Sequence, residues 1–285
     1  MPIYSNVMKT RLTLLLLLSF SVTAFGQKMP SDYFQEANDY FEEGKLHNAL
    51  AGYMYIVENH PRNELYPRAL NNAGYICLLQ KKYKKAIEVF SLILNGNQDE
   101  REPSGGGIMA SPYANYCHRA ASQISDCYYE LRQYDSALNY LALSDTVYPF
   151  LSDCGNAYAD NDIQTALRYA DIYQRLGQPD KAIEKLLPQV FNTELADNSK
   201  IIAKLEKLLK GKPKLLEQLE KAIEGVYQKT FTSDYGDYER YCIQWLGVEI
   251  RYPKRSFNSA DYNKENVMKW MRESEFYQMV AQMKR

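Results

Sequence analysis

Residues 40–61 read YFEEGKLHNALAGYMYIVENHP, and the spacing of four residues in this stretch decides the fold. Gly44 is followed by the small residue Ala49, the aromatic residue Tyr53 and finally Pro61. Glycine favours a turn and proline ends a helix, so the residues between them predict one helix with both ends marked. Such a spacing indicates architecture if it recurs along the chain, and chance if it stands alone.

The spacing recurs when the sequence is set in a frame of about 34 residues. The frames begin at Pro30, Pro67, His118 and Ile163. Positions 8 and 20 carry small residues: Ala37 and Ala49, Gly74 and Ala86, Ser125 and Ala137, and Ala170 and Ala182. Position 15 is Gly44 in the first frame and Gly177 in the fourth, and position 24 carries large apolar residues such as Tyr53, Phe90 and Leu186.

This pattern resembles the tetratricopeptide repeat family over residues 30 to about 191. The resemblance implies antiparallel helix pairs that cross at positions 8 and 20, turn near position 15 and fill the gap to the next unit with position 24. One pair cannot bury its apolar face alone, so the pairs stack. The alternative is a set of unrelated helical hairpins with alanines placed by chance.

We therefore expect an all-α fold, a right-handed α-α superhelix of about four repeats. The repeats are expected near residues 30–63, 67–97, 118–149 and 163–191. An irregular, glycine- and proline-containing loop is expected over residues 95–111. The first step between frames, through HPRNELYPRALNNAGY, resembles that of exported bacterial cell-envelope repeat proteins.

Composition supports a helical, non-nucleic-acid-binding protein. The 285 residues include 25 Tyr but only 14 Gly, which suits helices packed through aromatic rings better than a turn-rich β-sandwich. The formal net charge is −1, so no basic excess attracts nucleic acid or anionic lipid.

The N-terminus predicts export. Lys9 and Arg11 precede an uncharged apolar run over residues 12–25, which ends in small residues before Gln27. These are the features of a secretory signal peptide over residues 1–26, and they predict a periplasmic or cell-envelope location. The alternative, a membrane anchor, is disfavoured because a span needs about 20 apolar residues.

The frame is lost after Phe191. Residues 192–230 contain two amphipathic segments split by Gly211 and Pro213, which predict a helical hairpin or a degenerate repeat. Residues 231–285 predict a short β-hairpin around Leu246 and Gly247, followed by one final helix.

No enzymatic motif is present, so we expect no enzyme, no cofactor and no metal site. The five cysteines lack zinc spacing and are interpreted mainly as small buried residues. The histidines His47, His60 and His118 are interpreted as solvent-exposed loop residues rather than ligands.

A binding surface remains. The resemblance implies that the concave face is built from first-helix positions, and aromatic and amide residues there suit a peptide. The implied peptide-binding residues are Phe34, Asn38, Phe41, Asn72, Tyr75, Arg119, Asp126, Tyr129, Arg168 and Asp171. The family's clamp for a peptide C-terminal carboxylate is incomplete, because Phe34 and Gln123 stand where it has a lysine and an arginine.

Three hypotheses follow. The first is a non-enzymatic scaffold that binds a peptide or protein segment in the concave groove. The second is an adaptor in envelope assembly or polysaccharide uptake that docks through its C-terminal region. The third is an enzyme whose site lies within residues 192–285.

Overall fold

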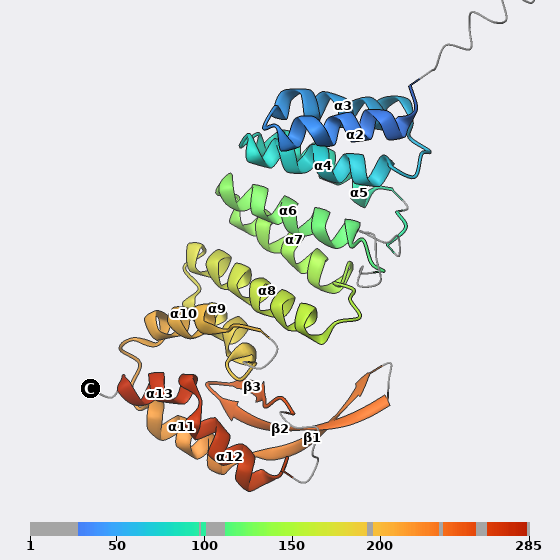
Figure 1. The fold of residues 1–285 in the computed structure, drawn as a ribbon. Coiled ribbons are helices and arrows are strands. Elements are labelled where there is room, and N and C mark those ends of the chain that lie inside the picture. The colour runs from blue at the N-terminus through green and yellow to red at the C-terminus, as the bar shows by residue number, and fades with distance from the viewer. Residues whose placement is uncertain are drawn as a thin grey trace, which may run out of the picture. The chain divides into compact units, whose positions relative to one another are not determined.

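The computed structural model describes residues 28–96, 98–100, 112–192, 196–233, 236–254 and 261–283 (Figure 1). The predicted signal peptide and most of the predicted loop 95–111 lie outside these residues. The described residues form two compact units, 28–80 and 81–283. Helices dominate both units, and the strands belong to one small sheet near the C-terminus, so the predicted all-α repeat fold with a C-terminal β element is confirmed.

The first unit is a stack of three helices. They are α2 (Pro30–Glu42), α3 (Leu46–Asn59) and α4 (Tyr66–Leu79). Helix α3 packs against both α2 and α4. The buried faces are lined by Ala37, Tyr53, Ile56, Leu70 and Ile76, which recur at helical spacing and so give each helix one apolar side.

The second unit begins with helices that pack in chain order. They are α5 (Tyr83–Leu94), α6 (Tyr116–Glu130), α7 (Tyr134–Thr146), α8 (Gly155–Arg175) and α9 (Pro179–Leu186), followed by the 3₁₀ helix η1 (Leu187–Gln189). Each of these α-helices contacts its successor. This is the arrangement expected of stacked helix pairs.

The turn at position 15 has the same backbone conformation in all four frames. The φ angles are +74° at Gly44, +56° at Lys81, +60° at Arg132 and +70° at Gly177. This left-handed conformation closes the preceding helix through hydrogen bonds such as Lys45 N to Tyr40 O (2.8 Å). The predicted turn is therefore confirmed, and two frames form it without glycine.

The small residues at positions 8 and 20 are buried. Ala37, Ala49, Ala86 and Ala137 have no exposed surface. In the third frame the Ser125 hydroxyl donates a hydrogen bond of 2.7 Å to the Ala137 carbonyl, so even the polar member of the set is used in the helix crossing.

Beyond the repeats, two helices and a sheet share one core. The helices α10 (Ser199–Leu209) and α11 (Leu215–Glu224) both pack against α13 (Glu275–Gln282). The sheet has the order β1-β2-β3, with β1 (Tyr227–Ser233), β2 (Gly236–Trp245) and β3 (Val248–Arg251), and it is antiparallel.

The predicted hairpin between β2 and β3 is confirmed. Its turn is formed by Leu246 (φ +50°) and Gly247 (φ +81°), the conformation that matches strand twist in a two-residue loop. The sequence interpretation was wrong about β1, which had been assigned in part to a helix. It was also wrong about a single final helix, because Ser274 separates α12 (Lys264–Glu273) from α13 and accepts a hydrogen bond from Tyr277 N.

One face of the sheet supplies the core of this region. Ile243, Trp245 and Ile250 pack with Val267 of α12 and Phe276 of α13. A lone hairpin is marginally stable in water, so this contact with helices is what the strands require.

The described residues contain no helix that is both long and apolar enough to cross a membrane. All five cysteines lie within the described residues and none is in a disulfide. Cys77, Cys117, Cys127 and Cys242 are buried, and Cys154 is exposed.

The close crossing of α2 and α3 in the first unit leads to a prediction about the stability of a Gly52 variant. A Cβ atom placed there would lie 2.8 Å from the Ala37 Cβ atom, so α2 and α3 leave no room for a side chain. We expect Gly52→Leu to lower the free energy of unfolding by about 1–3 kcal/mol, measured by urea unfolding. The control is Ala51→Leu at the neighbouring exposed position. Equal stability of Gly52→Leu and Ala51→Leu would contradict the close packing of α2 against α3 at Gly52.

A second prediction concerns Glu220 on α11. Its carboxylate accepts hydrogen bonds from Arg272 Nε (3.0 Å) and Nη2 (2.7 Å) and from the Tyr277 hydroxyl, and the Arg272 contact holds its pKa below the ordinary value of 4.5. A lowered pKa stabilises the fold above pH 4.5, and this stabilisation is lost as the pH falls through the folded-state pKa.

We therefore expect Glu220→Gln to be less stable than the wild type in urea at neutral pH, with the difference shrinking as the pH falls below 4.5. The matched control is Glu217→Gln, which alters an exposed carboxylate on the same helix. A stability difference that does not depend on pH would show that the Glu220 charge is not the stabilising feature.

Candidate functional site

A cavity of about 390 Å³ lies on the first unit and gathers residues that the sequence analysis assigned to peptide binding. Helix α2 contributes four of its lining residues, α3 contributes one and α4 contributes two. They are Gln35, Asn38, Phe41, Glu42, Tyr53, Asn72 and Tyr75. The predicted residues Asn38, Phe41, Asn72 and Tyr75 are thus brought together.

Aromatic rings form the apolar part of this cavity. The Phe41 and Tyr75 ring centroids are 6.3 Å apart at an interplanar angle of 51°. Tyr75 is 47% exposed, so the pair presents apolar surface to solvent, whereas Tyr53 is 2% exposed and forms a fixed wall. Phe34, also predicted, packs behind this wall with its ring centroid 5.4 Å from that of Tyr53.

Amide groups form the polar part. The Tyr53 hydroxyl donates a 2.6 Å hydrogen bond to Asn38 Oδ1. Asn71 Nδ2 donates a 3.2 Å hydrogen bond to Asn72 Oδ1. Burial raises the pKa of the Tyr53 hydroxyl, and its contact with Asn72 opposes that rise. Both asparagine oxygens are therefore held in place, and the Asn38 amide nitrogen is oriented away from Tyr53.

The lining carries one carboxylate, Glu42, and no cation. Recognition of a peptide C-terminal carboxylate relies on cationic donors. Because Phe34 stands where the family's clamp has a lysine, this cavity lacks the positive charge that a carboxylate clamp needs. The aromatic and amide groups that remain suit an extended peptide held through a side chain and its backbone.

Four of the five predicted binding residues of the second unit make contacts between helices. Asp126 on α6 and Arg168 on α8 form an ion pair of 3.2 Å, and Arg168 also donates to the Ser122 hydroxyl. Burial raises the pKa of the Asp126 carboxyl, and Arg168 opposes that rise. The two predicted charges thus satisfy one another.

The remaining predicted residues of this unit lie on the same two helices. Asp171 on α8 accepts a hydrogen bond from Lys204 on α10. The Tyr129 hydroxyl accepts a hydrogen bond of 3.1 Å from Arg175 Nε. Arg119 on α6 is exposed. Described cavities of this unit are lined by other residues.

The sequence analysis did not place Gln35, Glu42 or Tyr53 among the residues that line this cavity. Tyr53 was assigned to packing, because position 24 fills the gap between units. Its ring does so, but its hydroxyl reaches the polar end of the cavity. The signal that could have revealed this is the hydroxyl itself, since a buried tyrosine hydroxyl usually finds a hydrogen-bond partner.

The histidine interpretation was wrong for His118. This residue lies on α6, and its Nδ1 atom is 3.0 Å from the carbonyl oxygens of both Ser144 and Tyr148. It therefore holds the C-terminal end of α7. Within the described ranges, no group of three or more His, Cys, Asp or Glu side chains could hold a metal ion.

Comparison with known families agrees with the repeat frame. Residues 67–95 match the family model described as tetratricopeptide repeat, and this segment coincides with the second predicted repeat. No curated protein matches the sequence.

Several solved structures are similar to the chain at low identity. A MamA double mutant is 18% identical over 65% of this chain and 85% of its own, with a TM-score of 0.46. A tetratricopeptide repeat protein from Parabacteroides merdae is 15% identical over 69% of this chain and 64% of its own, with a TM-score of 0.46. A repeat protein from Bacteroides fragilis is 15% identical over 90% of this chain and 98% of its own, with a TM-score of 0.41.

The cavity makes a prediction about its fixed wall. Tyr53→Phe removes the hydroxyl that holds Asn38 but keeps the ring, so we expect a loss of about 1 kcal/mol in the free energy of unfolding. Urea unfolding measures this loss. Tyr40→Phe is the control, because the Tyr40 ring contacts Lys45 and its hydroxyl bonds to no described residue. A loss no larger than that of the control would contradict the hydrogen bond.

Proposed function

We propose that this protein is a non-enzymatic interaction scaffold that binds an extended segment of a protein partner in the cavity of the first unit. One observation carries the proposal. Asn38, Phe41, Asn72 and Tyr75, which the repeat frame assigns to recognition, line a single cavity. Rigid helices present these residues on a preformed surface, which limits the entropy lost on binding.

Each group of the cavity has a role in this proposal. An apolar side chain of the partner enters between Phe41 and Tyr75, where removal of aromatic surface from water drives binding. The amides of Asn38 and Asn72 bond to the partner's backbone, whose donors and acceptors must be paired when they leave water. Tyr53 keeps Asn38 in position through its hydroxyl.

The partner segment is internal in its own chain. A C-terminal carboxylate would enter a cavity whose only charged lining residue is Glu42, and no lining cation would offset its charge. An internal segment carries only neutral backbone groups and avoids this cost.

We also propose that the protein acts after export, with residues 1–26 removed. The apolar run over residues 12–25, which follows Lys9 and Arg11, supports this location. Mass spectrometry of the protein recovered from the cell envelope tests it, since the proposal requires Gln27 as the first residue.

Selection of random peptides by phage display tests the binding function. Peptides selected on the wild-type chain are expected to bind Phe41→Ala and Tyr75→Ala at least about tenfold more weakly, because each change removes one side of the aromatic pair. Isothermal titration calorimetry measures the affinities, and circular dichroism confirms that the variants fold.

Tyr55→Ala is the matched control. Tyr55 is an exposed aromatic residue of the same unit that does not line the cavity, so its removal should leave peptide affinity unchanged. The proposal fails if no peptide is selected, or if Tyr55→Ala weakens binding as much as Phe41→Ala.

A further inference from the structure

The largest cavity described in the second unit has a volume of about 820 Å³ and lies beside the C-terminal sheet. One wall comes from β2, β3 and the residues that follow β3, including Tyr238, Arg240 and Arg251. The other wall comes from the first half of α8 and the η1 region, including Tyr158, Asp162 and Asn192. Its volume is within the range typical of sites for small molecules.

The sheet wall belongs to the face opposite the core. Strand register places one set of alternating residues on this face: Tyr227, Lys229, Phe231, Tyr238, Arg240, Cys242, Gln244, Glu249 and Arg251. The opposite face carries Ile243, Trp245 and Ile250, which are buried. The charged and aromatic residues are therefore a second surface of the sheet, separate from its packing surface.

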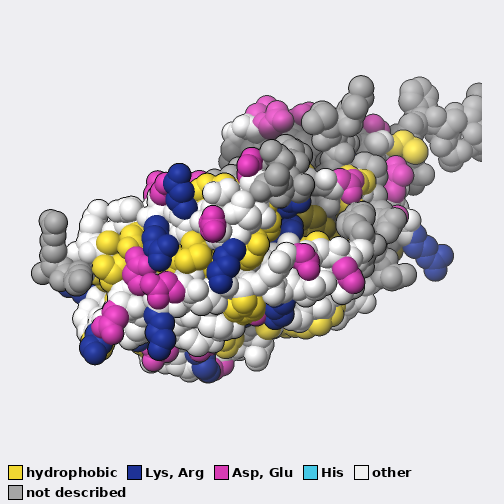
Figure 2. Space-filling view, turned by 90° about the horizontal axis from the view of Figure 1, so that it is seen from below, with side chains coloured by type: hydrophobic (Ala, Val, Ile, Leu, Met, Phe, Trp, Pro, Cys, Tyr) yellow, Lys and Arg dark blue, Asp and Glu magenta, His cyan; other side chains and the backbone are white. Residues whose placement is uncertain are grey.

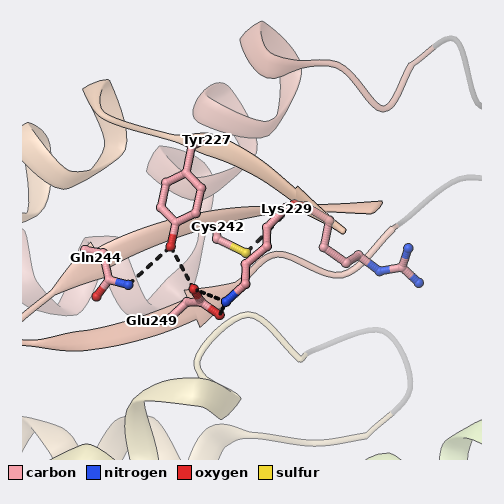
Figure 3. Close-up of polar contacts among 6 residues, drawn as sticks. Tyr227, Lys229, Cys242, Gln244 and Glu249 are labelled. Atoms are coloured by element: carbon pink, nitrogen blue, oxygen red, sulfur yellow. Dashed lines mark hydrogen bonds and ion pairs between the residues drawn. The ribbon is translucent and has the colours of Figure 1, made fainter. Parts of the chain in front are cut away.

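Glu249 is already neutralised on this face. Its carboxylate accepts hydrogen bonds from Lys229 Nζ (2.9 Å) and from the Tyr227 hydroxyl (2.8 Å), as Figure 3 shows. The Lys229 contact lowers the pKa of Glu249, so the carboxylate stays charged and paired. Glu249 and Lys229 thus leave no net charge for a ligand.

Arg240 and Arg251 are not neutralised in this way. Neither forms an ion pair with a described acidic residue, although the positive charge of Arg251 contributes to the lowered pKa of Glu249. Each guanidinium lies over an aromatic ring. Arg240 is 4.6 Å from the Tyr238 ring centroid, and Arg251 is 3.9 Å from that of Phe231. Arg240 Nη1 also donates a 2.8 Å hydrogen bond to the Glu239 carbonyl oxygen. A guanidinium carries five N–H donors, so stacking on a ring and this one bond hold Arg240 in place while other donors remain for a ligand.

The opposite wall has a different character. Asp162 forms no ion pair with a described residue, and burial raises the pKa of its carboxyl. Gln189 and Asn192 add amides beside it, and the ring of Tyr158 is 41% exposed. This wall offers acceptors for hydroxyl groups, and it would repel a ligand that carries negative charge over its whole surface.

We propose that this cavity binds an acidic sugar, with its carboxylate on Arg240 and Arg251 and its hydroxyl groups on Asp162 and the neighbouring amides. Guanidinium groups bind planar carboxylates in a bidentate manner, which accounts for the sheet wall. Hydroxyl groups are donors to a carboxylate, which accounts for Asp162. Tyr158, which is 41% exposed and lines the cavity, supplies an aromatic surface for the ring of the sugar.

Positive and negative side chains are mixed on the face of the molecule that Figure 2 shows. In Figure 2, which views the molecule from below Figure 1, Lys and Arg side chains alternate with Asp and Glu across the described part of this face. No large patch of one sign is visible among those side chains.

The test is calorimetric titration of the purified chain with trigalacturonate and with its fully methyl-esterified form. Binding of trigalacturonate, and at least about tenfold weaker binding of the ester, is expected because the ester keeps the hydroxyl groups and loses the charge. Arg240→Gln and Arg251→Gln should each weaken trigalacturonate binding by a similar factor. Arg132→Gln, which removes an exposed arginine outside the cavity, should not.

Asp162→Ala distinguishes an acidic sugar from other anions. Loss of the hydroxyl acceptor should weaken trigalacturonate binding several-fold, whereas removal of a negative charge would strengthen binding of a simple anion. The proposal is overturned if trigalacturonate does not bind, if the ester binds equally well, or if Asp162→Ala strengthens binding. It is also overturned if a hexa-aspartate peptide or inorganic phosphate binds as tightly as trigalacturonate.

Discussion

The close crossing of paired helices at small buried residues is the constraint on which the repeat region depends. Ala37 and Ala49 have no exposed surface, and the room for a Cβ atom at Gly52 is already taken by Ala37. The left-handed residue at position 15 ends the first helix of each pair and reverses the chain within a few residues, so the two helices lie side by side. Lys81 and Arg132 adopt the same conformation although they are not glycines. Since such a conformation costs a non-glycine residue about 1–2 kcal/mol, packing of the two helices must offset it.

The crossing also fixes which side chains of neighbouring helices meet. In the first unit these side chains line a cavity, and in the second they form ion pairs. In the first unit, aromatic and amide side chains of α2 and α4 meet at a cavity without a cation. In the second, Asp126 and Arg168 join α6 to α8, and Asp171 joins α8 to Lys204 of α10. Charges that pair between helices brace the stack, whereas exposed rings such as Tyr75 remain available to a partner.

The repeat pattern ends in the C-terminal region. There the apolar faces of the helices pack against a β-sheet as well as against other helices. Helices α10 and α11 both rest on α13, and the sheet places Trp245 and Ile250 in the same core. Because successive residues of a strand face opposite ways, filling that core exposes a second set of side chains on the other face. Arg240 and Arg251, which form no ion pair with an acidic residue that the structure describes, lie on that face as a consequence of register.

Sequence alone determined the features that depend on local spacing. The helix pairs, the turns at Gly44 and Gly177, the buried alanines and the hairpin at Leu246 and Gly247 all follow from residues close together in the chain. Tertiary structure alone decided which polar groups meet. Strand β1 needed β2 as a partner, and the carboxyl of Asp126 needed Arg168, 42 positions away. The same holds for the hydroxyl of Tyr53, which reaches Asn38 only because α2 and α3 cross. Spacing in sequence carries no information about such contacts, because side-chain pairing depends on how elements distant in the chain pack.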